Sequence, residues 1–224
     1  MNQVEILPAV NAATWEGVQE KVRQVEPYVR WVHLDVADGT YTPNTLWHNA
    51  AELFTLQAHI LIEVHLMVAE PETVIDAWIG AGAKRLIVHV DTIKDFKFIK
   101  ARCDQAKVLL TLAISPTIPW TELVPYMKEN VVSYQVLAVH PGLAGQDVID
   151  AGPEDHNYVE SSYDAVRHIR DRLPWCDIEV DGGVRVGTAK KFKEAGANLL
   201  AAASAIFSAP DIKKAIEELE EDVA

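Results

Sequence analysis

The sequence predicts an α/β protein, a single-domain (β/α)8 TIM barrel over residues 1–224. Short apolar, β-branched runs alternate with longer amphipathic stretches from end to end, and no linker rich in Gly, Ser or Pro interrupts them. Strict alternation implies a parallel sheet with right-handed crossovers, and eight such units close into a barrel. A doubly wound open sheet is the alternative, disfavoured because no G-x-G-x-x-G follows the first strand.

The eight predicted strands are short apolar runs bounded by turn residues. They are Val4–Ala9, Trp31–Val36, Ile60–Met67, Arg85–Val90, Lys107–Ile114, Val132–Val139, Asp177–Val180 and Leu199–Ala202. Helical periodicity is expected after each strand. Examples are Thr14–Val25, Pro71–Gly80, Tyr158–Leu173 and Asp211–Asp222.

Charge and composition restrict the class of partner. The chain has 20 Lys and Arg against 33 Asp and Glu, a net charge of −13, which argues against nucleic acid because phosphate-backbone binding needs a basic face. Hydrophobic residues make up 49% of the chain, enough for a full core, and no apolar run approaches the ~18 residues of a membrane span. Cys103 and Cys176 are isolated thiols. A cytoplasmic protein without a membrane partner is expected.

One segment, 147–157, has four acidic residues and no periodicity, and it lies between the sixth predicted strand and the following helix. A loop of this length on the active-site face of a barrel is usually functional or disordered. A mobile lid and an acidic surface loop are both open interpretations.

Polar residues at the carboxyl ends of three predicted strands suggest a metal site. A period of two puts His33 and Asp35 on one face of the second strand, while the third and seventh strands end near His65 and Asp181. Two imidazoles and two carboxylates suit one divalent ion, and they do not discriminate among Zn, Fe, Mn and Co. Each residue alone could be a helix cap or a satisfied core residue, but their coincidence at one barrel end favours the metal site.

A weaker rival lies on the fourth predicted strand, where His89 and Asp91 repeat the same spacing. They are alternative ligands, but we expect His89 to support a ligand or contact the substrate, because metal-bound imidazoles usually need an outer partner.

Small residues follow the sixth, seventh and eighth strands, where barrels often bind phosphate through backbone N–H groups. Gly182 and Gly183 follow the seventh strand, Ala203 and Ser204 the eighth, and the glycine-containing segment 140–146 the sixth. A phosphorylated substrate is expected, with ordinary turn glycines as the simpler explanation. No lysine ends a predicted strand, which disfavours Schiff-base chemistry.

Five motifs together resemble the signatures of the ribulose-phosphate 3-epimerase family, in that family's order, from about Ile6 to Phe207. They are His33-Leu34-Asp35-Val36-Ala37-Asp38-Gly39 with Pro43-Asn44, Val64-His65-Leu66-Met67-Val68, Val139-His140-Pro141-Gly142-Leu143-Ala144-Gly145-Gln146, Ile178-Glu179-Val180-Asp181-Gly182-Gly183-Val184 and Ala203-Ser204-Ala205-Ile206-Phe207. The resemblance implies a metal-dependent isomerase that interconverts D-ribulose 5-phosphate and D-xylulose 5-phosphate by inverting C3, and a homo-oligomer.

The resemblance also implies roles for individual residues. Its metal ligands match His33, Asp35, His65 and Asp181, and its two acid/base aspartates match Asp35 and Asp181. Its substrate contacts match His65, Gly142, Leu143, Ala144, Gly145, Gly182, Gly183, Ala203 and Ser204.

The chain also departs from that family's pattern in the pocket. Ala9 replaces a serine, Ala37 a methionine, His140 an asparagine and Ala203 a glycine, while Leu143-Ala144 replaces Phe-Gly and 147–157 resembles an insertion. These changes leave two alternatives: an epimerase of another sugar phosphate such as allulose 6-phosphate, or a non-catalytic paralogue that binds metal and sugar phosphate. A barrel decarboxylase or hexulose-phosphate synthase is disfavoured, because the third strand has no Asp-x-Lys-x-x-Asp.

Overall fold

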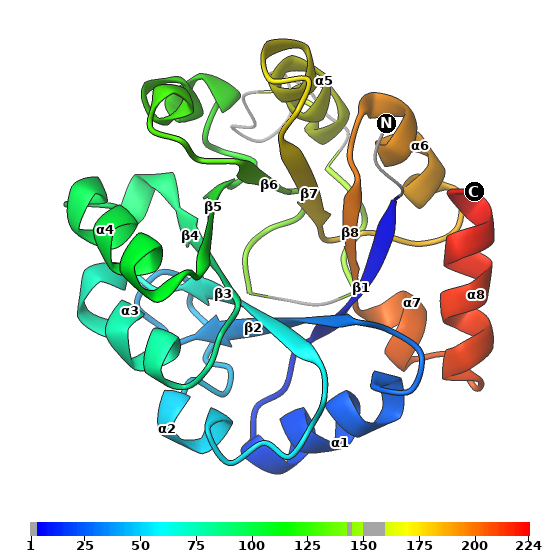
Figure 1. Cartoon of the computed structure of the whole chain (residues 1–224). Coiled ribbons are helices and arrows are strands. Elements are labelled where there is room, and N and C mark those ends of the chain that lie inside the picture. The colour runs from blue at the N-terminus through cyan, green and yellow to red at the C-terminus, as the bar shows by residue number, and fades with distance from the viewer. Residues whose placement is uncertain (1–3, 143–144, 150–159) are drawn as a thin grey trace.

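The computed structural model describes residues 4–142, 145–149 and 160–224, which form a closed barrel of eight parallel strands. The strands follow one another around the barrel in chain order, and the first pairs with the last. Figure 1 looks along the barrel, with the helices forming an outer ring around the strands. The predicted (β/α)8 barrel is confirmed, and the doubly wound alternative is wrong.

All eight predicted strands exist. They are β1 (Glu5–Val10), β2 (Trp31–Ala37), β3 (Leu61–Met67), β4 (Arg85–His89), β5 (Leu109–Ile114), β6 (Ser133–Leu137), β7 (Asp177–Asp181) and β8 (Leu199–Ala202). The largest boundary errors are two residues each: β6 was expected to end at Val139, and β5 was expected to begin at Lys107. That residue instead ends the preceding helix in the left-handed conformation, with φ of 58°.

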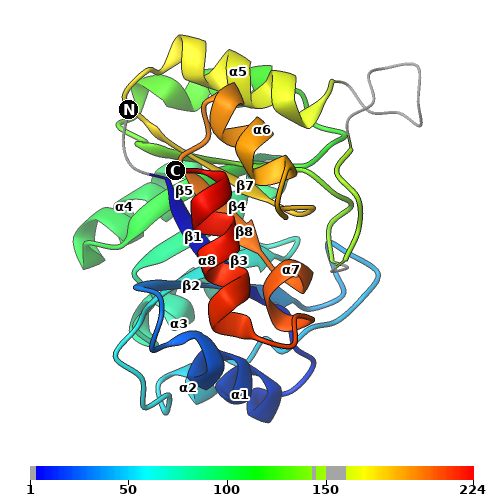
Figure 2. The same cartoon turned by 90° about the vertical axis from the view of Figure 1, so that its right-hand side faces the viewer.

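The helices match the predicted pattern except after β5. They are α1 (Trp15–Val25), α2 (Ala50–Leu53), α3 (Pro71–Gly80), α4 (Phe96–Ala106), α5 (Ser162–Arg172), α6 (Thr188–Ala195), α7 (Ser204–Phe207) and α8 (Ile212–Asp222), with 3₁₀ segments η1 (Val90–Thr92) and η2 (Trp120–Lys128). The connection after β5 is η2, which contains Pro125, a residue with no N–H for an α-helical hydrogen bond. Figure 2 shows α8 lying across the outside of the barrel, where it contacts β1.

The barrel interior is divided into a polar and an apolar part. Leu7, Ala9, Leu199 and Ala201 form a small apolar cluster from β1 and β8, separate from the large core that packs the strands against the helices. From β2 round to β7 the buried polar side chains are His33, Asp35, Glu63, His65, Arg85, His89, Thr111, Ser133, Gln135, Glu179 and Asp181. The polar part is therefore where chemistry has to be sought.

The acidic segment predicted at 147–157 lies mostly outside the described residues. Its first residues, 147–149, are described, and Ile149 donates its N–H to the Ala138 carbonyl at 2.8 Å. Across the described part of the chain, no helix combines the length and apolar character that a membrane crossing requires.

Candidate active site

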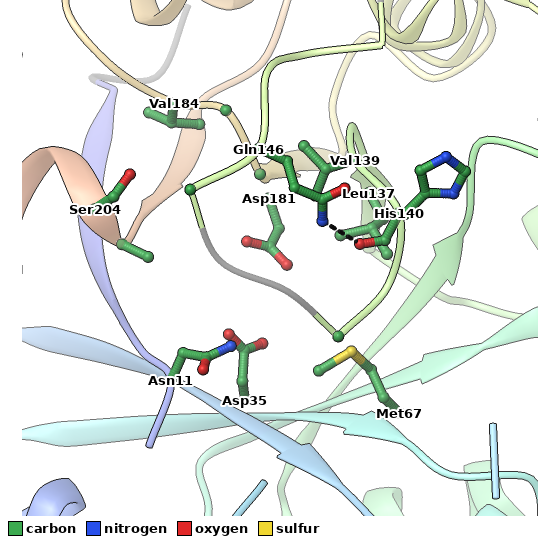
Figure 3. A pocket seen from close by; sticks show the side chains of 15 residues that line it. Asn11, Asp35, Met67, Leu137, Val139, His140, Gln146, Asp181, Val184 and Ser204 are labelled. Atoms are coloured by element: carbon green, nitrogen blue, oxygen red, sulfur yellow. Dashed lines mark hydrogen bonds between the residues drawn. The ribbon is translucent and has the colours of Figure 1, made fainter. Parts of the chain in front are cut away.

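A pocket opens at the carboxyl ends of the strands, as the barrel fold predicts for a catalytic site. Its lining residues are Asn11, Asp35, Met67, Leu137, Val139, His140, Gly142, Gly145, Gln146, Asp181, Gly182, Gly183, Val184, Ala203 and Ser204. Figure 3 shows the carboxylates of Asp35 and Asp181 pointing toward each other across this pocket. Of the residues expected to contact substrate, Leu143 and Ala144 lie outside the described residues, and His65 is fully buried beneath the pocket.

The four predicted metal ligands lie together at the base of the pocket. His33 and Asp35 come from β2, His65 from β3 and Asp181 from the end of β7. The register of the sheet pairs Asp35 with His65 directly, so the two side chains are neighbours on adjacent strands. One ligand atom from each residue lies within 4.8 Å of all the others.

The spacing of these atoms fits a divalent metal ion. Ligands at the usual distances from zinc form a tetrahedron with edges of about 3.3 Å. The Oδ1 atom of Asp35 is 3.3 Å from Nε2 of His33 and 3.2 Å from Nδ1 of His65. The Oδ2 atom of Asp181 is 3.3 Å from the same His65 nitrogen and 3.8 Å from Nε2 of His33. Two neutral imidazoles and two carboxylates also balance a 2+ charge.

Charge and burial have opposite effects on the pKa values of the residues in this cluster. Burial raises the pKa of Asp35, but hydrogen bonds from His33 and His65 outweigh it and hold that pKa well below its usual value. Burial lowers the pKa of His33, yet the surrounding carboxylates, Asp181 first, raise it well above its usual value. The pKa of His65 is raised by the two aspartates against the effect of burial. The metal-free cluster therefore holds protons that a bound cation would displace.

Beneath the cluster, His33 rests on two fully buried glutamates. Its Nδ1 lies 2.7 Å from Glu63 Oε1 and 3.0 Å from Glu179 Oε1. Arg85 Nη1 contacts Glu63 Oε2 at 2.5 Å, and Gln135 donates to Glu179 at 3.0 Å. Burial and then the charge of Glu179 raise the pKa of Glu63. Since a carboxylate accepts from Nδ1–H, Nε2 of His33 is the atom turned toward the two aspartates.

On the other side, His65 is backed by a neutral residue. Its Nε2 lies 2.8 Å from Nε2 of His89, and the two rings stack with centroids 5.0 Å apart. Burial and the neighbouring His65 lower the pKa of His89 well below its usual value. His89 is thus turned away from the aspartates, which disfavours its reading as a ligand.

The small-residue loops around the pocket contact one another closely. A Cβ atom at Gly183, whose φ is 66°, would lie 2.4 Å from Cγ2 of Val148, so this glycine also admits the segment after β6. Asn44, in the loop after β2, donates to the carbonyl of Gly142, which lines the pocket. Arg185 pairs with Asp147 at 3.0 Å rather than lining the pocket.

Sequence reasoning gave no role to three buried residues under the site. Glu63 and Glu179 lie two residues before His65 and Asp181, and Arg85 lies four residues before His89, so each shares a strand face with a polar residue already singled out. The same period of two that places those residues inside the barrel would have placed these. Asn11 and Gln146, which line the pocket from loops, have no such signal.

Comparison with known sequences gives a consistent assignment. A family model described as the ribulose-phosphate 3 epimerase family matches residues 5–207. The ribulose-phosphate 3-epimerase of Bacillus subtilis is 31% identical, with 96% of this chain and 98% of the relative aligned. The enzyme of that name from Schizosaccharomyces pombe is 27% identical, with 100% and 95% aligned.

Solved structures of two other enzymes share this fold. A 3-hexulose-6-phosphate synthase from Salmonella typhimurium has a TM-score of 0.73 at 13% identity and covers 98% of each chain. An orotidine 5'-phosphate decarboxylase from Pyrococcus horikoshii has a TM-score of 0.68 at 16% identity, covering 97% of this chain and 98% of the other. At such identities the likeness concerns the fold alone.

Proposed function

This chain belongs to the ribulose-phosphate 3 epimerase family, an isomerase family whose model matches residues 5–207, and from that premise we propose that it inverts C3 of a ketose phosphate. The substrate pair we propose is D-ribulose 5-phosphate and D-xylulose 5-phosphate. The observation that supports this most directly is the facing pair of carboxylates, Asp35 and Asp181, inside a cluster of metal-ligand type at the base of the pocket.

Inversion at C3 needs two acid/base groups, because the proton is removed from one face of the carbon and returned to the other. In the proposed mechanism Asp35 and Asp181 serve opposite faces and exchange roles with the direction of the reaction. Asp35 is ionised at neutral pH, because hydrogen bonds from His33 and His65 lower its pKa, so it has a free carboxylate to accept a proton. The product of proton removal is an enediolate between C2 and C3 of the sugar.

We propose that His33, Asp35, His65 and Asp181 hold one divalent metal ion. When bound, this ion would supply a Lewis acid that stabilises the negative charge of the enediolate. The protein residues fix the geometry, since all four ligands are at least nine-tenths buried on three neighbouring or facing strands.

The phosphate is proposed to lie over Gly182, Gly183, Ala203 and Ser204, whose backbone N–H groups can approach an anion closely. Neither lysine nor arginine occurs among the described residues that line the pocket. Backbone donors therefore have to supply most of the binding, and Ala203 restricts it more than a glycine would. A homo-oligomer in the cytoplasm is the accompanying proposal.

The test is solvent exchange at C3. We expect the purified, metal-loaded protein to replace the C3 proton of D-ribulose 5-phosphate with deuterium in D2O while forming D-xylulose 5-phosphate, both followed by NMR. Faster exchange with D-allulose 6-phosphate would assign another ketose. A protein that binds sugar phosphate and metal without any exchange would be the non-catalytic paralogue.

Two variants test the acid/base pair. Asp35→Asn and Asp181→Asn should each abolish epimerisation, and their losses should not add because the two residues act as one unit. Metal content has to be measured alongside, since both are also proposed ligands. Asp171→Asn, on the exposed surface of α5, is the matched control and should retain full activity. Near-normal activity in both site variants would contradict the mechanism.

A further inference from the structure

Four side chains form a hydrogen-bond chain that runs from the metal-type cluster to the protein surface. Nε2 of His65 meets Nε2 of His89 at 2.8 Å, and Nδ1 of His89 meets the Tyr41 hydroxyl at 3.2 Å. That hydroxyl lies 3.3 and 3.4 Å from the two carboxylate oxygens of Asp91. The chain joins β3, the end of β4, η1 and the loop after β2, so it exists only in the folded barrel.

The Asp91 carboxylate, at the outer end of the hydrogen-bond chain, sets the direction of every hydrogen bond in it. The Asp91 carboxylate only accepts, so the Tyr41 hydroxyl donates to it. The hydroxyl oxygen then accepts from Nδ1–H of His89. A neutral His89 with its proton on Nδ1 has a lone pair on Nε2, and that lone pair accepts from Nε2–H of His65.

The consequence reaches the cluster itself. With its proton on Nε2, a neutral His65 presents a lone pair at Nδ1. That nitrogen faces Asp35 Oδ1 at 3.2 Å and Asp181 Oδ2 at 3.3 Å, both of which are acceptors as well. Three acceptors converging on one point require a cation between them. The direction of the hydrogen bonds and the spacing of the cluster therefore both indicate a cation site.

Tyr41 is held firmly enough to act in this way. Its ring packs against the buried cluster of Ala37, Leu46 and Met67, and it lies 4.7 Å from the His89 ring between centroids. The side chain is anchored by apolar contacts, so its hydroxyl is presented to His89 and Asp91 without depending on either.

We propose that Tyr41 and Asp91 are positioning residues that hold His65 in the tautomer able to bind a divalent metal through Nδ1. The inference rests on the proposed metal site, and it assigns a role to two residues that belong neither to the metal-type cluster nor to the pocket lining. The same tautomer of His89 is expected with and without metal, because a protonated His65 also has its Nε2–H directed at His89.

Metal affinity of the full-length protein is the first test. The dissociation constant for Zn²⁺, measured by competition with a chelating indicator, should rise about three- to tenfold in Tyr41→Phe, which removes the hydroxyl and keeps the ring. It should rise about 10- to 100-fold in His89→Leu, as for other outer partners of metal ligands. His89→Gln, which restores an acceptor near the Nε2 position, should recover most of that loss. Tyr28→Phe, between α1 and β2 at the other barrel end, is the control and should match wild type.

The tautomers themselves are the second test. Nitrogen-15 NMR of the histidine rings should show His89 protonated at Nδ1 and not at Nε2, in both the metal-free and the zinc-loaded protein. Protonation of His89 at Nε2, or an unchanged zinc affinity in Tyr41→Phe, would overturn the inference. A wild-type protein with no measurable affinity for zinc, iron, manganese or cobalt would instead contradict the proposed metal site, so the two failures are distinguishable.

Discussion

His33 and His65 occupy similar places beside Asp35 and Asp181, yet the residues behind them differ in kind. Behind His33 lie two buried glutamates with Arg85, sealed inside the barrel. Behind His65 lies the hydrogen-bond chain that ends at the surface. The two proposed metal ligands are therefore held by separate means, His33 by a buried charge cluster and His65 by a chain of hydrogen bonds. Changes on the two sides should therefore affect different properties.

The largest effect is expected from Arg85→Met on the buried side. Arg85 is only 5% exposed, and its loss removes the guanidinium that pairs with Glu63 and lies 3.8 Å from Glu179. Breaking a buried ion pair from one side costs about 3–5 kcal/mol, measured as the free energy of unfolding in denaturant. The control is Arg102→Met, whose exposed pair with Asp76 should cost at most about 1 kcal/mol. Equal effects of the two variants would show that the glutamates do not depend on Arg85.

Next in size are the two ligand deletions. His33→Ala and His65→Ala should each lower metal occupancy at least about tenfold by elemental analysis, since even outer-partner losses reach that range. Both should also lower the free energy of unfolding of the metal-free protein, His33→Ala by about 1–3 kcal/mol more, because the two fully buried glutamates beneath it also lose a donor. His59→Ala, at an exposed position, is the control. Unchanged metal content in His65→Ala would contradict the proposed ligand set.

An effect of intermediate size is expected from pH on the thermal stability of the metal-free protein. The pKa of His33 is raised in the folded metal-free protein, so the stability it contributes is fully present below its unfolded pKa of about 6.5 and is lost as pH rises through the folded pKa. The metal-loaded protein has no such proton to lose. The difference in Tm between loaded and metal-free protein should therefore grow from pH 6 to pH 9. A constant difference over that range would show that His33 does not bind a proton in the metal-free state.

The smallest effects are expected on metal affinity, from one conservative change behind His33 and one behind His65. Glu179→Gln removes a buried charge that supports His33 and should weaken metal binding about tenfold. Asp91→Asn keeps an oxygen that can accept from Tyr41, so the affinity should change less than about threefold, within one neutral hydrogen bond. Calorimetric titration with metal would measure both, with Glu217→Gln on the surface of α8 as control. A larger loss in Asp91→Asn would mean that its charge acts on His65 directly.

The barrel could be predicted from the sequence because each buried strand appears there as a short apolar run. Leu199–Ala202 was predicted with its observed bounds, and Pro71–Gly80 likewise among the helices. The errors lie where side-chain period is uninformative. Lys107 directly precedes an apolar run but ends α4 in the left-handed conformation, and Pro125 prevents a regular α-helix after β5.

The site was predictable to the extent that it lies on strands. His33 and Asp35, on one face of β2, could be placed in the barrel from their spacing alone. Tyr41 could not, because it lies in a loop and its partner Asp91 is 50 positions away. That contact depends on how the loop after β2 crosses the end of β4, which only the folded structure specifies. The buried glutamates are an intermediate case. Their position inside the barrel could be predicted from the strand period, but their contacts with His33 and Arg85 could not.

The seam between β1 and β8 has a consequence for how the protein is made. The segment Glu5–Pro8 pairs with Leu199–Ala202, so the barrel cannot close on the ribosome until nearly the whole chain has been synthesised. The charged residues of the interior therefore remain accessible to solvent during translation, until the barrel closes. Glu63 and Arg85 are direct neighbours on β3 and β4, so each can neutralise the other as soon as those two strands pair. Glu179, on β7, is synthesised much later, after six strands that already include His33 and Arg85.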